Sequence, residues 1–227
     1  SWRPHLTNTA KDPVPKKARK TRILDAAEAL FAQYGYDGVT LRQITKLAGV
    51  DVALANYHFG PKRDLFNAVL ERRADVLNNA RHTALDECLR AAGTSAPTVE
   101  AIIDAYLAPL GKIHNSADEG WKHYLALIAY VNNSHEYGRQ FMTQFFNPLV
   151  KRFIDALRQA LPDADEKAIY WGYHYLSGAL TLTFADTGRI DILSGGIASS
   201  SDTKTGYAHM TPFIAAGMRA ICAPGET

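Results

Sequence analysis

The chain has 227 residues, of which 47% are hydrophobic and 21% charged, and its formal net charge is +2. This composition is typical of a folded protein with a sizeable core and excludes a wholly disordered chain. The two cysteines form no CxxC motif, no apolar run is long enough to span a bilayer, and the N-terminus lacks an apolar signal core. We therefore expect a soluble, cytoplasmic protein.

The charges are unevenly distributed along the chain. Residues 1–65 contain eleven Lys and Arg against six Asp and Glu, an excess of +5, and the remainder carries −3. Residues 1–20 combine three prolines with the run KKARK and are predicted to form a flexible basic arm. A basic end on a mildly acidic body indicates a polyanionic partner, although KKARK alone is equally consistent with a solvated tail.

Residues 21–66 are predicted to form three helices and to constitute a DNA-binding domain. Thr40 and Asp51 are residue types that cap helix N-termini, and Gly49 provides a tight turn between them. Two short helices that cross and pack on a third form a helix-turn-helix. From apolar spacing and these caps, the helices are expected at residues 23–34, 41–48 and 52–58.

The third helix is expected to present one face to DNA. At 100° per residue, Leu54 and His58 turn inward and Asn56 turns outward. Asparagine can form a bidentate pair with adenine, small apolar side chains can approach thymine methyl groups, and tyrosine and basic side chains contact phosphates. A solvated face is the simpler interpretation of such a helix alone, but the caps, the turn and the basic arm together favour DNA. The predicted DNA-binding residues are Thr40, Arg42, Val52, Ala53, Asn56, Tyr57, His58 and Lys62.

His58 has two interpretations, because its inward position would let it order the end of the helix instead of touching DNA.

The remainder of the chain, residues 67–227, is predicted to be an all-helical effector-binding and dimerisation domain. The whole protein is thus all-α with about nine helices, and 189–193 is at most a short extended piece. A long helix follows Lys62, and the later helices are expected near residues 98–113, 119–133, 136–160, 165–186 and 204–222.

Aromatic residues are frequent in this second domain. An ordinary helix-bundle core explains most of them, and an apolar effector cavity with a few orienting polar groups is the functional alternative. The candidate pocket residues are Trp121, His123, Tyr124, Ile128, Asn132, Phe141, Phe145, His174 and Tyr175. HExxH, GxSxG and glycine-rich phosphate loops are absent from the sequence, so we expect no catalytic residue, metal site or cofactor.

The last two long helices contain small residues that allow close helix approach, and two such helices from each subunit would form a four-helix bundle. The alternative is that this seam packs only within its own subunit. Pro212 is expected to kink the final helix or to start a new segment. The candidate dimer residues are Gly172, Gly178, Ala179, Met210, Ile214, Gly217 and Ile221.

Residues 22–70 resemble the DNA-binding domain of the tetracycline-repressor (TetR) family. The resemblance rests on RILDAAEALFAQYGYDGVTLRQITKLAGVDVALANYHFGPKRDLF, and above all on AGV followed by NYHFGPKRDL. Thr45 and Asp51 depart from the family's usual alanine and serine. The resemblance assigns Thr40, Arg42 and Lys62, with Asn56 and Tyr57, to positions that usually touch DNA.

The same resemblance implies a homodimer whose two heads read a palindromic operator in double-stranded DNA. It implies a ligand-responsive repressor that a small hydrophobic or aromatic effector releases, with fatty acyl compounds among the candidates. An activator, and a DNA-binding regulator without a small-molecule effector, are the alternatives. No membrane partner is expected.

Overall fold

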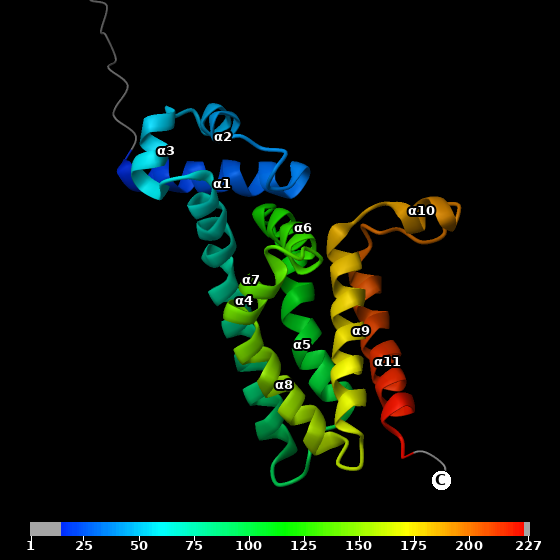
Figure 1. Ribbon diagram of the computed structural model, residues 1–227. Coiled ribbons are helices and arrows are strands. Elements are labelled where there is room, and N and C mark those ends of the chain that lie inside the picture. The colour runs from blue at the N-terminus through cyan, green and yellow to red at the C-terminus, as the bar shows by residue number, and fades with distance from the viewer. Residues whose placement is uncertain (1–14, 225–227) are drawn as a thin grey trace, which may run out of the picture.

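The computed structural model describes residues 15–224, which form eleven helices and no strand (Figure 1). The all-α prediction is therefore confirmed. The helices are α1 (Lys16–Tyr34), α2 (Leu41–Ala48), α3 (Val52–Phe59), α4 (Lys62–Ala92), α5 (Val99–His114), α6 (Gly120–Asn132), α7 (Gly138–Phe145), α8 (Asn147–Ala160), α9 (Glu166–Ala185), α10 (Arg189–Leu193) and α11 (Thr203–Cys222).

Helices α1, α2 and α3 form a head at one end of the molecule, and α4 runs from the head into the body (Figure 1). The Thr40 hydroxyl accepts a hydrogen bond from the Gln43 amide, and Gln43 Oε1 accepts one from the Thr40 amide at 2.8 Å, which completes a capping box. Gly49 ends α2 at φ 68°, in the left-handed region that glycine tolerates best. The helix-turn-helix signals read from the sequence are therefore the ones that the backbone uses.

The body is a bundle in which α4, α5, α8, α9 and α11 lie along the long axis of the molecule (Figure 1). Helix α6 lies directly beneath α1 and packs against both α1 and α9, so it connects the head to the body. Fully buried side chains such as Phe31, Phe66 and Leu85 belong to one continuous apolar core that passes from the head along α4.

Three sequence expectations need correction. Residues 136–160 form two helices, because Pro148 lacks an amide hydrogen and therefore starts α8 in its first turn instead of continuing α7. Residues 189–193 form one turn of helix and no extended piece. Pro212 does not start a new segment, since α11 is continuous through it, and the expected kink stays a prediction.

The predicted basic arm is also partly helical. Helix α1 already begins at Lys16, so residues 16–20 belong to the head, whereas residues 1–14 lie outside the described part of the chain.

Candidate nucleic-acid interface and head–body junction

The outer face of α3 is open to solvent. Ala53 and Asn56 are exposed, the Tyr57 side chain is 71% exposed, and Val52 is half-buried. Asp51 fixes the start of the helix, because its Oδ1 accepts a hydrogen bond from the Leu54 amide at 2.8 Å. The expected inward residue was Leu54, but the fully buried one is Ala55, with Leu54 only half-buried. The side of α3 that faces the core is therefore centred closer to Ala55 than to Leu54, about one residue later than the helical wheel indicated.

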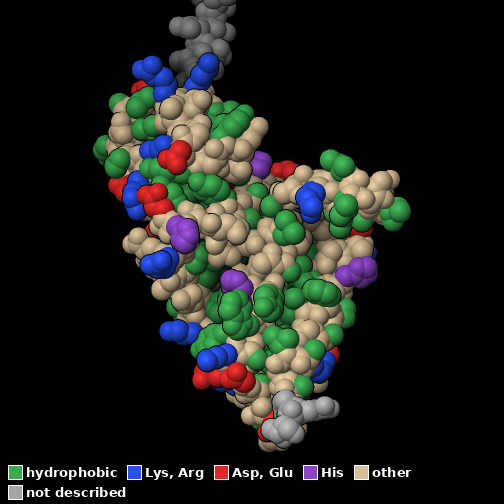
Figure 2. Space-filling model, turned by 45° about the vertical axis from the view of Figure 1, so that its right-hand side comes forward, with side chains coloured by type: hydrophobic (Ala, Val, Ile, Leu, Met, Phe, Trp, Pro, Cys, Tyr) green, Lys and Arg blue, Asp and Glu red, His purple; other side chains and the backbone are tan. Residues whose placement is uncertain are grey.

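Two exposed lysines of α1 lie beside α3. Lys16 Nζ donates to Tyr57 Oη at 3.3 Å and lies 5.0 Å from the centre of the tyrosine ring. Lys20 Nζ lies 5.6 Å from the Phe59 ring centre. Figure 2 shows lysine and arginine side chains gathered at this end of the molecule. Further exposed cations on α1 and α2 include Arg22, Arg42 and Lys46.

Lys62 has a role that the sequence did not reveal. Its Nζ donates to the Tyr36 carbonyl at 2.9 Å and to the Val39 carbonyl at 3.0 Å, and it lies 4.1 Å from the Tyr36 ring centre. In this structure the ammonium group is therefore engaged within the protein, and its predicted contact with DNA stays a prediction. Its ammonium group ties the first turn of α4 to the loop between α1 and α2.

His58 is half-buried, and its ring packs edge-on against Tyr57 with 5.3 Å between ring centres. Among the described residues its Nε2 is buried without a hydrogen-bond partner. This position agrees with the inward orientation derived from the helical wheel. Thr45, the unusual residue inside α2, is also buried, and its hydroxyl is satisfied by the Arg42 carbonyl at 3.1 Å.

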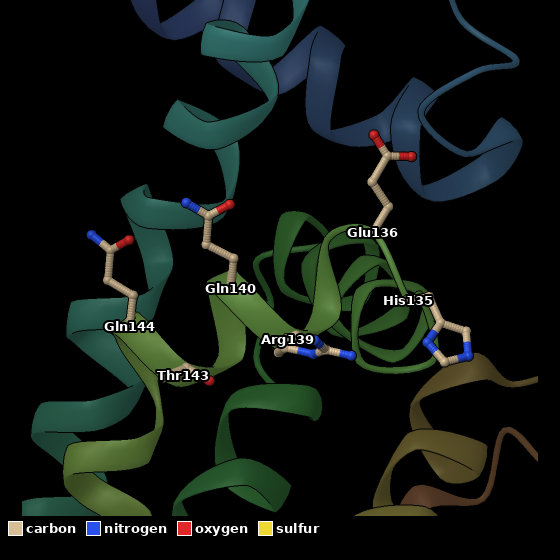
Figure 3. A pocket seen from close by; sticks show the side chains of 6 residues that line it. All are labelled: His135, Glu136, Arg139, Gln140, Thr143 and Gln144. Atoms are coloured by element: carbon tan, nitrogen blue, oxygen red, sulfur yellow. The ribbon is translucent and has the colours of Figure 1, made fainter.

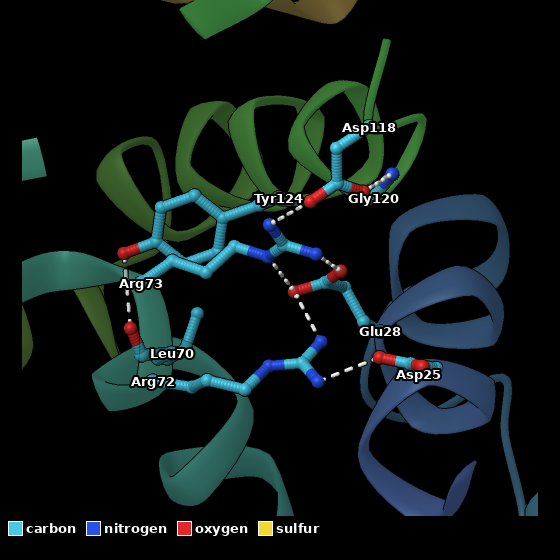
Figure 4. A network of polar contacts seen from close by, with 8 residues as sticks. All are labelled: Asp25, Glu28, Leu70, Arg72, Arg73, Asp118, Gly120 and Tyr124. Carbon is cyan, nitrogen blue, oxygen red and sulfur yellow. Dashed lines mark hydrogen bonds and ion pairs between the residues drawn. The ribbon is translucent and has the colours of Figure 1, made fainter. Parts of the chain in front are cut away.

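A buried ion-pair network joins the head to the body (Figure 4). Glu28 of α1 is 1% exposed, and its carboxylate accepts two hydrogen bonds from Arg73 of α4, at 2.9 and 3.0 Å. The third Arg73 bond goes to Asp118 Oδ2 at 2.8 Å, and Asp118 also accepts from the Gly120 amide at 2.9 Å. These contacts connect α1, α4 and the start of α6.

Two further contacts complete this junction. Arg72 Nη1 donates to Asp25 at 2.6 Å, and its Nη2 lies 3.1 Å from Glu28 without an aligned hydrogen bond among the described residues. The Arg73 guanidinium lies 4.7 Å from the Trp121 ring centre. Hydrogen bonding by Arg73 holds the pKa of Asp118 below its ordinary value. We did not predict this network. The sequence did contain a signal for it, because Glu28 lies beside the apolar positions of the first helix and a buried carboxylate needs a partner of opposite charge.

The predicted effector residues do not surround one cavity. Tyr124 is fully buried, where its hydroxyl donates to the Leu70 carbonyl at 2.9 Å, and Ile128 is also a core residue. Trp121 and His123 border a different cleft beside Arg72. His174 and Tyr175 point outward from α9, and Asn132 Nδ2 bonds Ser177 Oγ at 2.9 Å.

Phe141 and Phe145 are the predicted pocket residues that do line a shared cleft. It lies between α4 and α7, has a volume of about 120 Å³, and is also bordered by Phe66, Tyr137 and Gln140. A larger hollow of about 600 Å³ lies along α7 and the turn before it, but all the residues that line it have polar or charged side chains. Figure 3 shows its side chains splayed along the helix, with His135 and Glu136 pointing apart, so no reactive groups converge there.

The candidate dimer residues divide into two groups. Gly172, Met210 and Ile214 are buried inside the protomer, where a Cβ on Gly172 would come within 2.7 Å of Met218. These three belong to the internal packing of α9 on α11, and the prediction is wrong for them. Gly178, Gly217 and Ile221 are exposed, and Ala179 is half-buried.

The exposed group extends into an apolar face on α9 and α11. Trp171, Leu182 and Phe213 are 55%, 68% and 74% exposed, and Trp171 stacks on Tyr175. Hydrophobic side chains cover much of this side of the body (Figure 2). Trp171, Tyr175, Gly178 and Leu182 recur at spacings of three and four and therefore lie on one face of α9. This pattern in the sequence could have identified Trp171 and Leu182, which we did not predict.

Comparison with known proteins identifies the family. Residues 23–69 match the family described as bacterial regulatory proteins, tetR family, and residues 104–217 match the tetracyclin repressor-like C-terminal domain. The biofilm operon regulator IcaR of Staphylococcus aureus is 38% identical over 60 residues, which are 26% of this chain and 32% of IcaR. The regulator RutR of Escherichia coli is 40% identical over 71 residues, 31% of this chain and 34% of RutR. The matched segment thus spans about a third of each of these relatives.

Solved structures share the fold over most of the chain. A TetR-like regulator from Rhodococcus sp. RHA1 superposes with a TM-score of 0.56 at 18% identity, over 93% of this chain and 100% of that one. SmeT, the repressor of a Stenotrophomonas maltophilia multidrug efflux pump, gives 0.58 at 21% identity, over 87% and 88%. Within residues 15–224, none of the helices is both long and apolar enough to cross a bilayer. The chain belongs to the TetR family, whose members are DNA-binding regulators and not enzymes.

Proposed function

We propose that this protein is a transcriptional repressor that binds an operator as a homodimer through the outer face of α3 and leaves it when a small apolar or aromatic effector binds. The observation that carries the proposal is the exposed face of Ala53, Asn56 and Tyr57, which is positioned by two capped helices and has exposed lysines of α1 beside it. The description of IcaR as a negative regulator and of SmeT as a repressor supports the sign of control.

In the DNA-bound state, Asn56 would pair with an adenine edge, because its amide can donate and accept in the same plane. Ala53 is small enough for close contact with a thymine methyl group. Tyr57 and the surrounding lysine and arginine side chains would contact phosphates, which supplies affinity without sequence information. A dimer would place its two recognition helices about 34–36 Å apart, or at a multiple of that spacing, along one face of the duplex.

The apolar face of α9 and α11 is the proposed dimer interface. Among the described residues, a Cβ added to Gly178 or Gly217 would meet no atom within 4 Å. A glycine inside a helix costs roughly 1 kcal/mol relative to alanine, so packing within the protomer gives no reason for either residue. Close approach of a partner helix does give a reason, and the exposed Trp171 and Phe213 would be covered by the same contact.

The effector would act by moving α4. The first three turns of α4 border the cleft of Phe141 and Phe145, and Lys62 at the start of the helix fastens it to the head. A shift of α4 would therefore change the spacing of the two heads. The effector must bind the altered geometry more tightly than the DNA-binding one. The 120 Å³ cleft is smaller than an ordinary ligand pocket of about 300–1,000 Å³, so the cleft must widen around its ligand.

A regulator without a small-molecule effector is the second candidate, and the close packing of Tyr124 and Ile128 in the core favours it. Thermal denaturation with fatty acids, acyl thioesters and phenolic compounds separates the two candidates. Stabilisation by one class, together with weaker operator binding, supports the effector. No stabilisation by any class would support the second candidate.

The experiment for DNA recognition uses Asn56→Ala and a duplex selected by the wild-type protein from random sequences. The substitution should cost roughly 1–3 kcal/mol at one base position in each half-site and relax the preference there. Asn79→Ala makes the same change at an exposed position in the middle of α4 and should leave binding unchanged. Equal affinities for the Asn56→Ala and Asn79→Ala proteins would refute the assigned face.

A further inference from the structure

The segment of residues 187–202, here called the arm, carries an unusual arrangement of side chains. It connects α9 to α11, includes α10, and projects away from the body at the end nearest the head (Figure 1). Ile192, Leu193 and Ile197 are 86%, 74% and 93% exposed. Exposed loops of a monomer are normally polar, so three aliphatic side chains displayed together indicate a surface that is covered in the working protein.

The arm is ordered by its own hydrogen bonds. The Asp191 carboxylate accepts from the Ser200 amide and from the Ser199 hydroxyl, both at 2.9 Å. Ser200 Oγ accepts from the Gly188 amide at 3.2 Å, and Ser194 Oγ accepts from the Ala198 amide at 2.9 Å. Several polar groups are therefore used inside the arm, whereas Ile192, Leu193 and Ile197 lie on its outside.

An apolar groove of matching character lies at the same end of the body. It has a volume of about 640 Å³ and runs between α1, α6 and α9. Its floor is made of small side chains, including Ala126 and Ala129, and its walls include Tyr130 and Leu182, which are 42% and 68% exposed. No charged residue lines it, and Ile192, Leu193 and Ile197 are uncharged as well.

We propose that the arm of each subunit docks in the groove of a second copy of this chain, so that the two copies exchange arms across the dimer. The proposal rests on the homodimer of the proposed function. Both heads of that dimer face one duplex, so its two-fold axis runs from the head end to the far end of the bundle. Rotation about such an axis keeps every element at its own height.

The heights agree with this exchange. The arm leaves α9 at Ala185, and the groove is bordered by Gly178, Leu182 and Ala185 of the same end of α9. The groove also continues directly from the apolar face of α9 proposed for the dimer. A partner's arm that lies along this face therefore reaches the groove at the same height along the two-fold axis. Because Ala32 of α1 borders the groove, a docked arm would touch the partner's head as well as its body.

Cross-linking between differently labelled chains tests the exchange. One chain carries Ile197→Cys and the other Ala126→Cys, both with Cys88 and Cys222 replaced by serine and alanine. A short bis-maleimide should join the two chains in the mixed dimer. A stable dimer without this cross-link would overturn the arm exchange and leave the proposed dimer intact. A monomeric protein would overturn both.

A second measurement uses charge. Ile192→Lys with Ile197→Lys should raise the dissociation constant of the dimer at least tenfold in analytical ultracentrifugation, because both lysines would enter an uncharged groove. The protomer should keep its helical circular dichroism, since both positions are exposed in it. Val76→Lys, at a 54% exposed position on α4, is the matched control and should leave dimerisation unchanged. A dissociation constant within twofold of wild type for the double variant would overturn the proposal.

Discussion

Replacing Arg73 by methionine should destabilise the protein strongly, because it leaves the Glu28 carboxylate buried with an incomplete set of partners. Arg73 donates two hydrogen bonds to Glu28 and one to Asp118, and the two side chains of the pair are 12% and 1% exposed. Removing one partner of a buried ion pair costs about 3–5 kcal/mol. Arg72 stays 3.1 Å from Glu28, so we expect a loss near the lower end, about 3 kcal/mol.

For a protein of this size, about 3 kcal/mol corresponds to a fall in Tm of roughly 6–12 °C. Far-UV circular dichroism during thermal and urea denaturation measures both quantities. Lys122→Met is the matched control, because it breaks the pair with Glu119 whose side chains are 51% and 71% exposed, and it should cost under about 1 kcal/mol.

The double variant Glu28→Gln, Arg73→Met should be more stable than Arg73→Met alone, because it no longer buries a charge. If Arg73→Met costs no more than the control, or if the two substitutions simply add, the network does not act as a buried unit and the reasoning is refuted.

The remaining predictions concern separate parts of the protein. Lys62→Met should lower the free energy of unfolding by about 1–3 kcal/mol without DNA present, because it leaves two carbonyl acceptors unpaired. Arg42→Met is the control and should weaken DNA binding alone. Equal stability of the two variants would contradict the assigned role of Lys62. Gly178→Leu should raise the dissociation constant of the dimer at least tenfold in analytical ultracentrifugation, while the monomer stays folded. Ala91→Leu, at an exposed position on α4, is the control and should leave the dissociation constant unchanged. Unchanged dimerisation of Gly178→Leu would exclude Gly178 from the interface. Burial lowers the pKa of His114 below its ordinary 6.5; Asp186 opposes this with a smaller raising effect, and Lys122 adds a smaller lowering effect. The unfolded state therefore takes up the proton first, and stability should fall as the pH drops below about 6.5. Urea denaturation of His114→Phe should lose that part of the slope, which is at most about 1.4 kcal/mol per pH unit, and an unchanged slope would contradict the buried neutral imidazole.

The head was predictable because its signals are local. Thr40, Gly49 and Asp51 each act on the backbone within three residues, through a cap or a left-handed turn, so their identities determine the helix boundaries directly. The signal for the break between α7 and α8 was equally local, because it is Pro148 in the first turn of α8. The periodicity of the flanking apolar residues concealed that break.

The effector region was not predictable, for a physical reason. A core aromatic such as Tyr124 and a cleft aromatic such as Phe145 follow the same helical spacing, and only the neighbouring helix decides which one faces a cavity. Lys62 presents a similar problem, because an ammonium group can donate to a carbonyl or to a phosphate. Partners far apart in sequence, such as Glu28 and Arg73, are brought together only by the fold.

The central claim is that the outer face of α3 meets the bases of an operator, and tethered cleavage tests it most directly. A cysteine placed at the exposed Ala53, in a chain without its two native cysteines, would carry a DNA-cleaving metal chelate. The account predicts two symmetric clusters of strand scission, one in each half-site, separated by one turn of DNA or a multiple of it. Absence of cleavage on a bound duplex, or the same pattern from a chelate at Ala91 in the body, would contradict it.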